Sequence, residues 1–163
     1  MAIKVFDHIK PHGMINGGPF PIWAVSKEAA TTWLEGAVII GTAGYAVEGA
    51  DGPTKGTILG VAQSPAVSGE TEALIIPALP GVIFSGILST GDTGGDYTSL
   101  VGDRFLQFGV SLEGTTGTWY VNKADVTDMA VTVLDFIDAI GTNLTRIAFT
   151  FVDSVFGGHS LTP

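Results

Sequence analysis

The sequence contains no cysteine among its 163 residues. Disulfide bridges, iron–sulfur clusters, thiolate zinc sites and cysteine nucleophiles are therefore excluded. A chain of this length is about one domain, and such a domain buries roughly 70% of the surface that its unfolded chain exposes. The sequence therefore predicts a fold that is held by a hydrophobic core, without disulfide cross-links.

Charged residues are scarce, and positively charged residues are scarcer still. Charged side chains make up 14% of the chain, against about 25% in average domains. Seven basic and 16 acidic residues give a formal net charge of −9. Phosphate backbones and anionic membrane surfaces repel such a chain. We therefore expect neither nucleic acid nor a membrane among its partners.

The sequence shows neither the pattern of a signal peptide nor an uninterrupted apolar run. No long apolar stretch follows the first residues, and charges come soon, at Asp7 and Lys10. Residues 73–91 are uncharged over nearly the length of a membrane span, but Pro77 and Pro80 interrupt them. A spanning helix would be broken near its middle. We interpret this segment as two buried strands around a turn.

Apolar residues and turn-forming residues are abundant. Hydrophobic residues make up 45% of the chain, and its mean hydropathy is +0.41. Apolar surface beyond what one core can bury commonly becomes a subunit interface. The 23 glycines and eight prolines indicate many turns. This composition favours a β-rich subunit of a larger assembly.

Short runs rich in β-branched and aromatic residues recur from residue 36 onward, between turn-forming segments. The last runs are the clearest: Ile147, Phe149 and Phe151 alternate onto one face, and the short connection at 139–145 predicts a hairpin. We therefore expect a mainly β fold, a small barrel or sandwich with little helix. The predicted strands are residues 37–42, 57–62, 73–77, 82–88, 104–112, 118–122, 131–138 and 146–153.

Residues 1–35 differ from the β-rich domain predicted at residues 36–163. Residues 8–21 contain three prolines and three glycines, so that neither helical nor strand periodicity persists there. The segment is nevertheless apolar, which favours an extended arm along an apolar surface over a flexible linker. That surface is either the core of the same domain or a neighbouring subunit. The candidate interface residues of the arm are Ile9, Met14, Phe20, Ile22 and Trp23.

A short helical turn is predicted at the end of the arm, over residues 26–35. Ser26 is a suitable N-cap, and Gly36 follows the segment at the position where helices commonly end. In this interpretation the side chains of Trp33 and Leu34 face inward.

The three histidines offer little support for a metal site. His8, His12 and His159 all stand in Gly/Pro-rich or terminal segments. His8 and His12 have the i, i+4 spacing of a helical metal pair, but Pro11 and Gly13 disfavour a helix there. No third ligand is indicated, and we expect no metal at this pair.

The loop at residues 92–96 is the other candidate for chemistry. Its Asp-Thr-Gly start matches the triplet of aspartic proteases, and Asp92 and Asp96 could offer oxygens to a hard cation such as calcium. The glycine-rich surroundings instead favour a solvated hairpin loop, and an ion there is left open. Phosphate-binding loops and nucleophile elbows are absent from the sequence. We therefore expect no catalytic residues, no cofactor and no enzyme activity.

Two parts of the chain resemble a known family. The first comprises GAVII (36–40), GTILGVA (56–62) and ALIIPALPGVIF (73–84), and the second GTWYVNKAD (117–125), VLDFIDAIG (133–141) and RIAFTF (146–151). Together they resemble the head decoration, or capsid cement, proteins of tailed bacteriophages. The resemblance covers most of residues 36–156 through patterns of strands and turns, without a single diagnostic residue.

The resemblance implies a structural virion protein with a β-barrel-like body. Such proteins are often trimeric. They bind the outside of the capsid at the points where several coat subunits meet, and they help the shell to resist the pressure of the packaged DNA. The expected partners are therefore the major capsid protein and further copies of the chain, with assembly in the host cytoplasm. The family has no catalytic residues to transfer.

Other functions stay open from the sequence. Another virion component, such as a tail-tube or head-completion subunit, would share the same composition. A carbohydrate- or receptor-binding β module is a further alternative, because Trp119 and Tyr120 could line a groove. An enzyme is disfavoured by the small supply of histidines and converging carboxylates.

Overall fold

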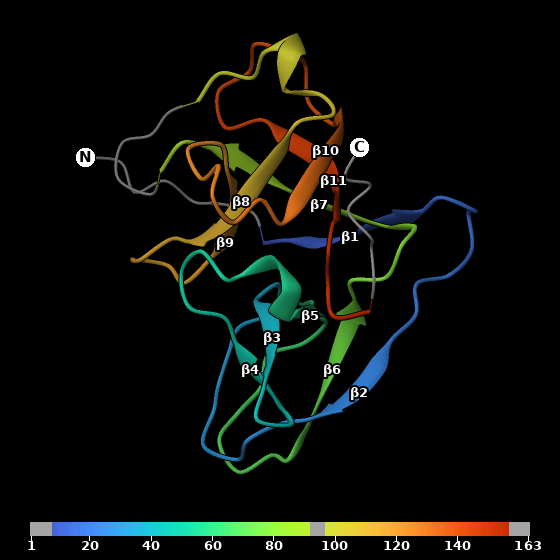
Figure 1. The fold of residues 1–163 in the computed structure, drawn as a ribbon, viewed down its shortest axis with the longest axis vertical. Helices are drawn as coiled ribbons and strands as arrows, with labels where there is room; N and C mark the ends of the chain where they lie inside the picture. The colour runs from blue at the N-terminus through green and yellow to red at the C-terminus, as the bar shows by residue number, and fades with distance from the viewer. Residues whose placement is uncertain (1–7, 92–96, 157–163) are drawn as a thin grey trace.

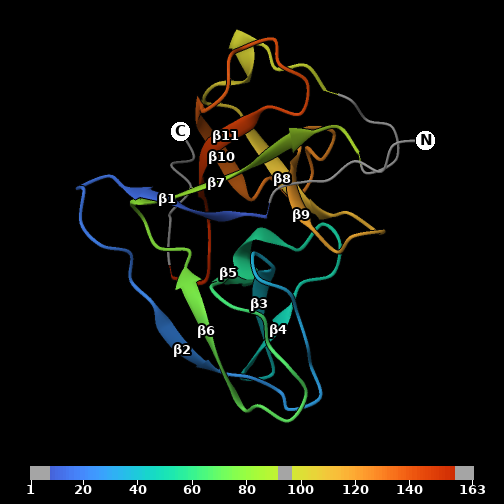
Figure 2. The ribbon, with the colours of Figure 1, turned by 180° about the vertical axis from the view of Figure 1, so that it is seen from behind.

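The computed structural model describes residues 8–91 and 97–156. In this part the chain is mainly β, and the helices are two single turns of 3-10 type, η1 (Lys55–Thr57) and η2 (Val101–Asp103). The strands form two curved sheets, which lie one beyond the other along the long axis of the molecule (Figures 1 and 2). The prediction of a mainly β fold with a barrel and little helix is confirmed.

The first sheet closes into a barrel of five strands in the order β7–β11–β10–β8–β9. A short parallel pairing closes it, with Leu88 beside Val121 and Ser89 beside Asn122. A sixth strand, β1 (Lys10–Met14), pairs with the first half of β7, which β9 leaves unoccupied. The barrel strands are β7 (Val82–Ser89), β8 (Gln107–Leu112), β9 (Trp119–Asn122), β10 (Val131–Phe136) and β11 (Arg146–Phe151).

The second sheet is antiparallel throughout, in the order β2–β6–β5–β3–β4. Strands β3 and β4 are joined by a two-residue turn, Ala43 and Gly44, whose φ angles are both positive, as tight hairpins require. A bridge between Lys27 and Ala46 brings the two outer strands together at one end. Its strands are β2 (Trp23–Ser26), β3 (Val38–Thr42), β4 (Tyr45–Glu48), β5 (Ile58–Ala62) and β6 (Glu72–Pro77).

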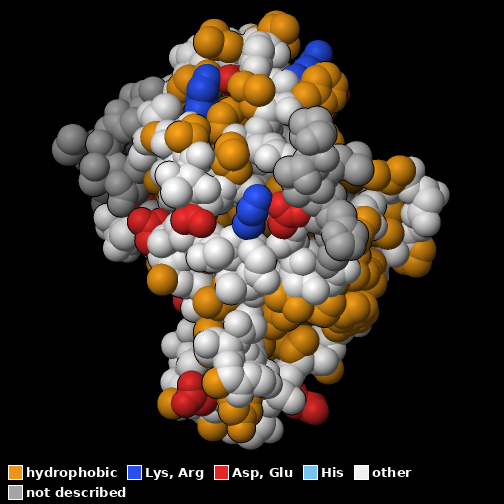
Figure 3. Space-filling model, in the orientation of Figure 1, with side chains coloured by type: hydrophobic (Ala, Val, Ile, Leu, Met, Phe, Trp, Pro, Cys, Tyr) orange, Lys and Arg blue, Asp and Glu red, His pale blue; other side chains and the backbone are white. Residues whose placement is uncertain are grey.

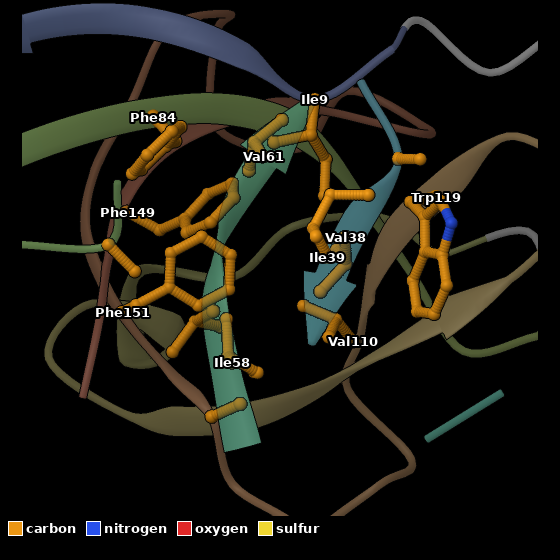
Figure 4. Close-up of a cluster of buried hydrophobic side chains, with 14 of the residues drawn as sticks. Ile9, Val38, Ile39, Ile58, Val61, Phe84, Val110, Trp119, Phe149 and Phe151 are labelled. Atoms are coloured by element: carbon orange, nitrogen blue, oxygen red, sulfur yellow. The ribbon is translucent and has the colours of Figure 1, made fainter. Parts of the chain in front are cut away.

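One hydrophobic core joins the two sheets (Figure 4). Ile58 of the second sheet and Phe84 and Phe149 of the barrel are all 0% exposed and belong to the same cluster. The rings of Phe84 and Phe149 stack at 6.1 Å between centroids, and Phe151 meets both rings edge-on. Because the buried side chains of both sheets form one cluster, the two sheets are parts of a single domain.

The N-terminal segment contributes a strand to each sheet. Strand β1 pairs with β7 of the barrel, and β2 pairs with β6 of the second sheet. Pro11 is tolerated because β1 is an outer strand, and the register shifts between Pro11 and Gly13. An outer strand needs hydrogen bonds on one edge only, so that it can contain proline and glycine. Because these residues are typical of turns, the sequence does not reveal the two strands.

Two local predictions are wrong. The helical turn predicted at residues 26–35 is absent, because Ser26 ends strand β2 and residues 27–35 form turns without a helix. Of the two side chains predicted to face inward, Trp33 is buried and Leu34 is exposed. The strand predicted from residue 104 begins only at Gln107, because Phe105 has a φ of +63°, outside the β region. The other seven predicted strands are present, with ends that differ by at most two residues.

The uncharged segment at residues 73–91 forms two strands, as predicted, but they belong to different sheets. Strand β6 belongs to the second sheet, and strand β7 belongs to the barrel. The turn between Pro77 and Val82 therefore carries the chain from one sheet to the other. Neither of the described 3-10 turns has the length or the apolar character of a membrane-spanning helix.

Replacing Gly60 by alanine is expected to destabilise the second sheet. A Cβ at residue 60 would lie 2.2 Å from the carbonyl oxygen of Ile76 in the neighbouring strand. Strands β5 and β6 would have to separate, which lowers the free energy of unfolding by about 1–3 kcal/mol. Urea unfolding measures the change. Gly41→Ala is the matched control, because a Cβ there would meet Leu59 at an ordinary 3.5 Å; equal losses in both variants would contradict the strand register.

Candidate interaction surfaces

The five predicted interface residues of the arm fall into two groups. Ile9 is 1% exposed, and Met14 and Phe20 pack against the core of the same chain. Ile22 and Trp23, in contrast, are 52% and 37% exposed. Ile9, Met14 and Phe20 therefore cover their own domain, and Ile9 is a core residue rather than an anchor on a neighbour. The second half of the arm carries two of the three exposed large apolar side chains among residues 8–23, and Ile15, which is 74% exposed, is the third.

The exposed half of the arm forms an apolar surface with strand β6. Leu74 of β6 is 41% exposed and is the Cα partner of Ala24, so that Ile22 points to the same face as Leu74. Trp23 points to the other face, where its ring meets Phe156 edge-on at 4.9 Å. We refer to Ile22, Trp23 and Leu74 as the β2–β6 surface. Figure 3 shows hydrophobic side chains gathered over these two strands.

A second apolar surface lies at the far end of the barrel, and we refer to it as the tip. It is formed by the segment around η2 and the loop between β10 and β11, which lie side by side in Figures 1 and 2. Backbone hydrogen bonds between Ser99 and residues 141 and 142 join these two segments. The exposed side chains of the tip are Leu100, Val101, Phe105, Leu106 and Ile140, which are 58%, 65%, 74%, 47% and 41% exposed.

Phe105 is the most unusual residue of the tip. Its left-handed backbone, at a φ of +63°, costs a residue with a Cβ about 1–2 kcal/mol, and its ring is largely in water. Two hydrogen bonds hold this conformation: the amide of Phe105 donates to the carbonyl of Val133 at 2.8 Å, and the amide of Val133 donates to the carbonyl of Leu106 at 3.0 Å. A strained, exposed aromatic residue in a turn that hydrogen bonds hold is a candidate binding residue.

A buried polar cluster supports the tip from below. Asp103, which is 1% exposed, accepts hydrogen bonds from the amide of Leu100 at 2.8 Å and from Tyr97 Oη at 2.8 and 3.0 Å. Lys123 Nζ lies 2.5 Å from Asp103 Oδ1 and also donates to Tyr97 Oη. Because Lys123 follows strand β9, the cluster ties the η2 turn to the barrel wall.

The cluster shifts the pKa of each of its three members. Burial alone would raise the pKa of Asp103, but hydrogen bonds from Lys123, Leu100 and Tyr97 hold it below its ordinary value. Burial raises the pKa of Tyr97, although the contact with Lys123 opposes this effect. Burial alone would lower the pKa of Lys123, but Asp103 and Tyr97 raise it above its ordinary value. At neutral pH the cluster is therefore an ion pair with a neutral tyrosine.

Two surface ion pairs flank the tip. Arg104 Nη2 lies 2.6 Å from Asp135 Oδ1, and Arg146 Nη2 lies 2.7 Å from Asp138 Oδ1. The Arg104 guanidinium also lies 5.3 Å from the ring centroid of Phe136, a favourable cation–π distance. Both arginines of the chain are therefore at this end, where each is neutralised by an aspartate.

Among the described residues, the remaining sequence candidates do not converge on a chemical site. His12 lies in strand β1 rather than in a helix, and His8 precedes it, while the Asp92–Asp96 loop and His159 lie outside the described residues. Within residues 8–91 and 97–156, no three histidine, aspartate or glutamate side chains are grouped so as to hold a metal ion. Trp119 and Tyr120 are 1% and 3% exposed, so they cannot line an open groove.

Sequence reasoning missed the tip. The run from residue 104 has the composition of a strand, and nothing in it indicates that an aromatic residue adopts a left-handed conformation. The supporting cluster is equally hidden, because Tyr97, Asp103 and Lys123 come from three separate segments of the chain.

Comparison of the chain with protein-family models, with curated proteins and with solved structures found no match.

Asp103→Asn is expected to lower the free energy of unfolding by about 1–3 kcal/mol at neutral pH, because it leaves the Lys123 ammonium without its carboxylate. The pH dependence gives a second readout. A lowered pKa of Asp103 in the folded state means that its contribution is lost as the pH falls below about 4. Urea unfolding between pH 3 and pH 7 measures this loss. The variant should show a weaker acid dependence than the parent, and an unchanged dependence would contradict the ion pair.

Proposed function

We propose that this chain is a structural virion protein that binds the outer surface of a bacteriophage capsid and stabilises the junctions between coat subunits. Its partners are the major capsid protein and further copies of itself, and we propose the homotrimer as its assembled form. The protein has no catalytic role and needs no cofactor in this proposal. The resemblance of its two β segments to capsid cement proteins supports the family, and the surface described above supports the mode of action.

The β2–β6 surface is the observation that carries the proposal. Ile22 and Leu74 are exposed on one face of the strand pair, and Trp23 is partly exposed on the other face. Tryptophan is among the residues that most often dominate the energy of protein interfaces. A neighbour that grips this strand pair from the side can contact both of its faces.

Charge supports a place on the outside of a DNA-filled shell. The formal net charge of −9 disfavours contact with packaged DNA. The described chain also offers little for catalysis: the Asp103 carboxylate is occupied by donors from Leu100, Tyr97 and Lys123 and is almost fully buried. A saturated, enclosed carboxylate cannot accept a proton from a substrate.

Stabilisation follows from the shape of the body. A closed barrel and a second sheet share one core, and such a unit resists deformation more than a chain held by loops. When it binds two coat subunits at once, the free energy of each contact adds to the cost of separating them. The shell is then stabilised without any chemical reaction.

The other functions considered from the sequence are less well supported. The glycan-binding alternative relied on Trp119 and Tyr120, and both are buried. A tail-tube or head-completion subunit would use the same kind of apolar surface, but it would assemble without a capsid.

Trp23→Ala is expected to weaken binding to capsids at least tenfold, which is more than it weakens the isolated fold. The side chain is 37% exposed and its ring contacts Phe156, so that its loss costs the fold part of its packing, whereas a central aromatic residue of an interface is worth about 2 kcal/mol or more. Co-sedimentation of the purified variant with capsids that have been stripped of this protein measures the number of bound copies per coat subunit.

Ile9→Ala is the matched control, because its side chain is 1% exposed. It should lower the free energy of unfolding by about 2–5 kcal/mol and leave the affinity of the folded fraction for capsids unchanged. The parent protein should saturate the particles at a fixed small ratio and protect them against heat. No binding at any ratio, or self-assembly of the protein without capsids into tubes, would overturn the proposal.

A further inference from the structure

The two ends of the molecule carry apolar features of opposite shape. The tip lies at one end of the long axis (Figure 1), and its Phe105 side chain is 74% exposed. The turn between β3 and β4 lies toward the other end (Figure 1), and beside it is a depression of about 400 Å³, which we refer to as the cup. The cup is lined by Val25, Ser26, residues 41–46 and Leu59.

The cup has a mainly apolar lining and is large enough to hold an aromatic side chain. Tyr45 forms one wall and is 49% exposed, and Val25 and Leu59 are partly exposed. Gly41 contributes no side chain to the lining, although its φ is not positive and a Cβ there would meet Leu59 at an ordinary distance. Glycine is unfavourable inside a strand, so that its presence at residue 41 keeps the cup open at some cost to the sheet.

The distribution of charge indicates that a second copy of the chain can bind at the two ends. Copies of a chain with a net charge of −9 repel each other wherever that charge is exposed. The lining of the cup contains no charged residue, and the two arginines that flank the tip are each paired with an aspartate. The tip and the cup are therefore ends at which two copies can meet without opposing net charge.

The borders of the two features differ in the hydrogen-bonding groups that they offer. Glu28 and Glu72 line a depression that shares Ser26 and Tyr45 with the cup. Both glutamates are exposed, and neither forms a salt bridge with any residue that the structure describes. The border of the tip carries the two arginine–aspartate pairs, and the arginine side chains are 39% and 45% exposed. A guanidinium has five N–H donors, so that each arginine can keep its aspartate and still donate to a glutamate of the next copy, which favours one orientation of two copies.

We propose that the protein associates with itself head to tail, with the tip of one copy seated in the cup of the next and the Phe105 ring inside the cup. The left-handed backbone at Phe105 then has a function, because the residue that adopts it has the most exposed side chain of the tip, at 74%. This contact supplies a surface for the self-association that the proposed function includes, and it rests on that function only for its biological setting.

A contact between two different surfaces differs from a symmetric one in its consequences. After the first contact one copy keeps a free cup and the other keeps a free tip, so that association continues until a ring closes or an open chain forms. A closed ring of three copies corresponds to the proposed trimer. A tip-to-tip contact would instead stop at two copies.

Two variants block the two ends separately. Phe105→Asn removes the ring and keeps the backbone, because asparagine tolerates a left-handed conformation. Gly41→Val fills the cup with a residue that strands favour, at a position where a Cβ has room. Tyr45→Glu is a second cup variant, since its half-exposed side chain can be replaced without loss of core packing. Val126→Asn is the matched control, because Val126 is 64% exposed and belongs to neither end.

Light scattering after size-exclusion chromatography and native mass spectrometry on the purified full chain test the proposal. The parent and Val126→Asn should form oligomers, and the three other variants should each associate at least tenfold more weakly. A mixture of Phe105→Asn and Gly41→Val should form a one-to-one dimer, because it contains one intact tip and one intact cup. Phe105→Asn with Tyr45→Glu should do the same.

Three results would overturn the proposal. A parent protein that stays monomeric up to millimolar concentration shows that the ends do not bind each other. Normal association of both cup variants with loss in Phe105→Asn shows a tip-to-tip contact. Mixtures that stay monomeric, with all variants folded by circular dichroism, show that the two ends are not partners. Binding of monomeric variants to stripped capsids is measured separately, so that failure of this contact is distinguishable from failure of capsid binding.

Discussion

The pairing of β7 with three different strands is the interaction on which the rest of the structure depends. β11 occupies one edge of β7, while β1 and β9 divide the other edge between them. The parallel contact with β9 closes the barrel, and the contact with β1 attaches the N-terminal segment. Gly86 permits this arrangement, because a Cβ there would lie 3.2 Å from the side chains of both Ile9 and Phe149. The arm, the barrel and the core therefore meet at one strand.

The ion pair between Asp103 and Lys123 positions the exposed apolar side chains of the tip. Asp103 and Lys123 form an ion pair inside the barrel end, and Tyr97 hydrogen-bonds to both. Buried ion pairs add little stability compared with apolar residues of equal size. Their effect here is geometric, since they hold the η2 turn and thereby direct the side chains of the tip into solvent. Backbone hydrogen bonds fix the main chain of Phe105 before any partner arrives, which lowers the entropic cost of binding.

The proposed roles use different surfaces for different partners. The β2–β6 surface lies on the side of the second sheet and is assigned to the capsid, whereas the tip and the cup lie toward the two ends of the long axis and are assigned to further copies of the chain. A decoration protein with this division could bind its shell and its neighbours at the same time. Because neither role needs a titratable group at the contact, the low content of charged residues, 14% of the chain, is consistent with both.

Composition and local pattern determined the fold class of this protein, because turn residues every eight to twelve positions and β-branched runs specify short strands whatever their partners are. The alternation of Ile147, Phe149 and Phe151 likewise predicted a buried face that the structure confirms. Tertiary structure alone decided the rest. The strands at residues 10–14 and 23–26 form because β7 and β6 offer free edges to them, and the same pairing places Ile9 in the core and Ile22 and Trp23 outside. Phe105 leaves the strand that its sequence favours because Val133 and the buried Asp103 hold the chain on either side of it. These outcomes depend on contacts between residues far apart in the chain, and local sequence patterns do not indicate such contacts.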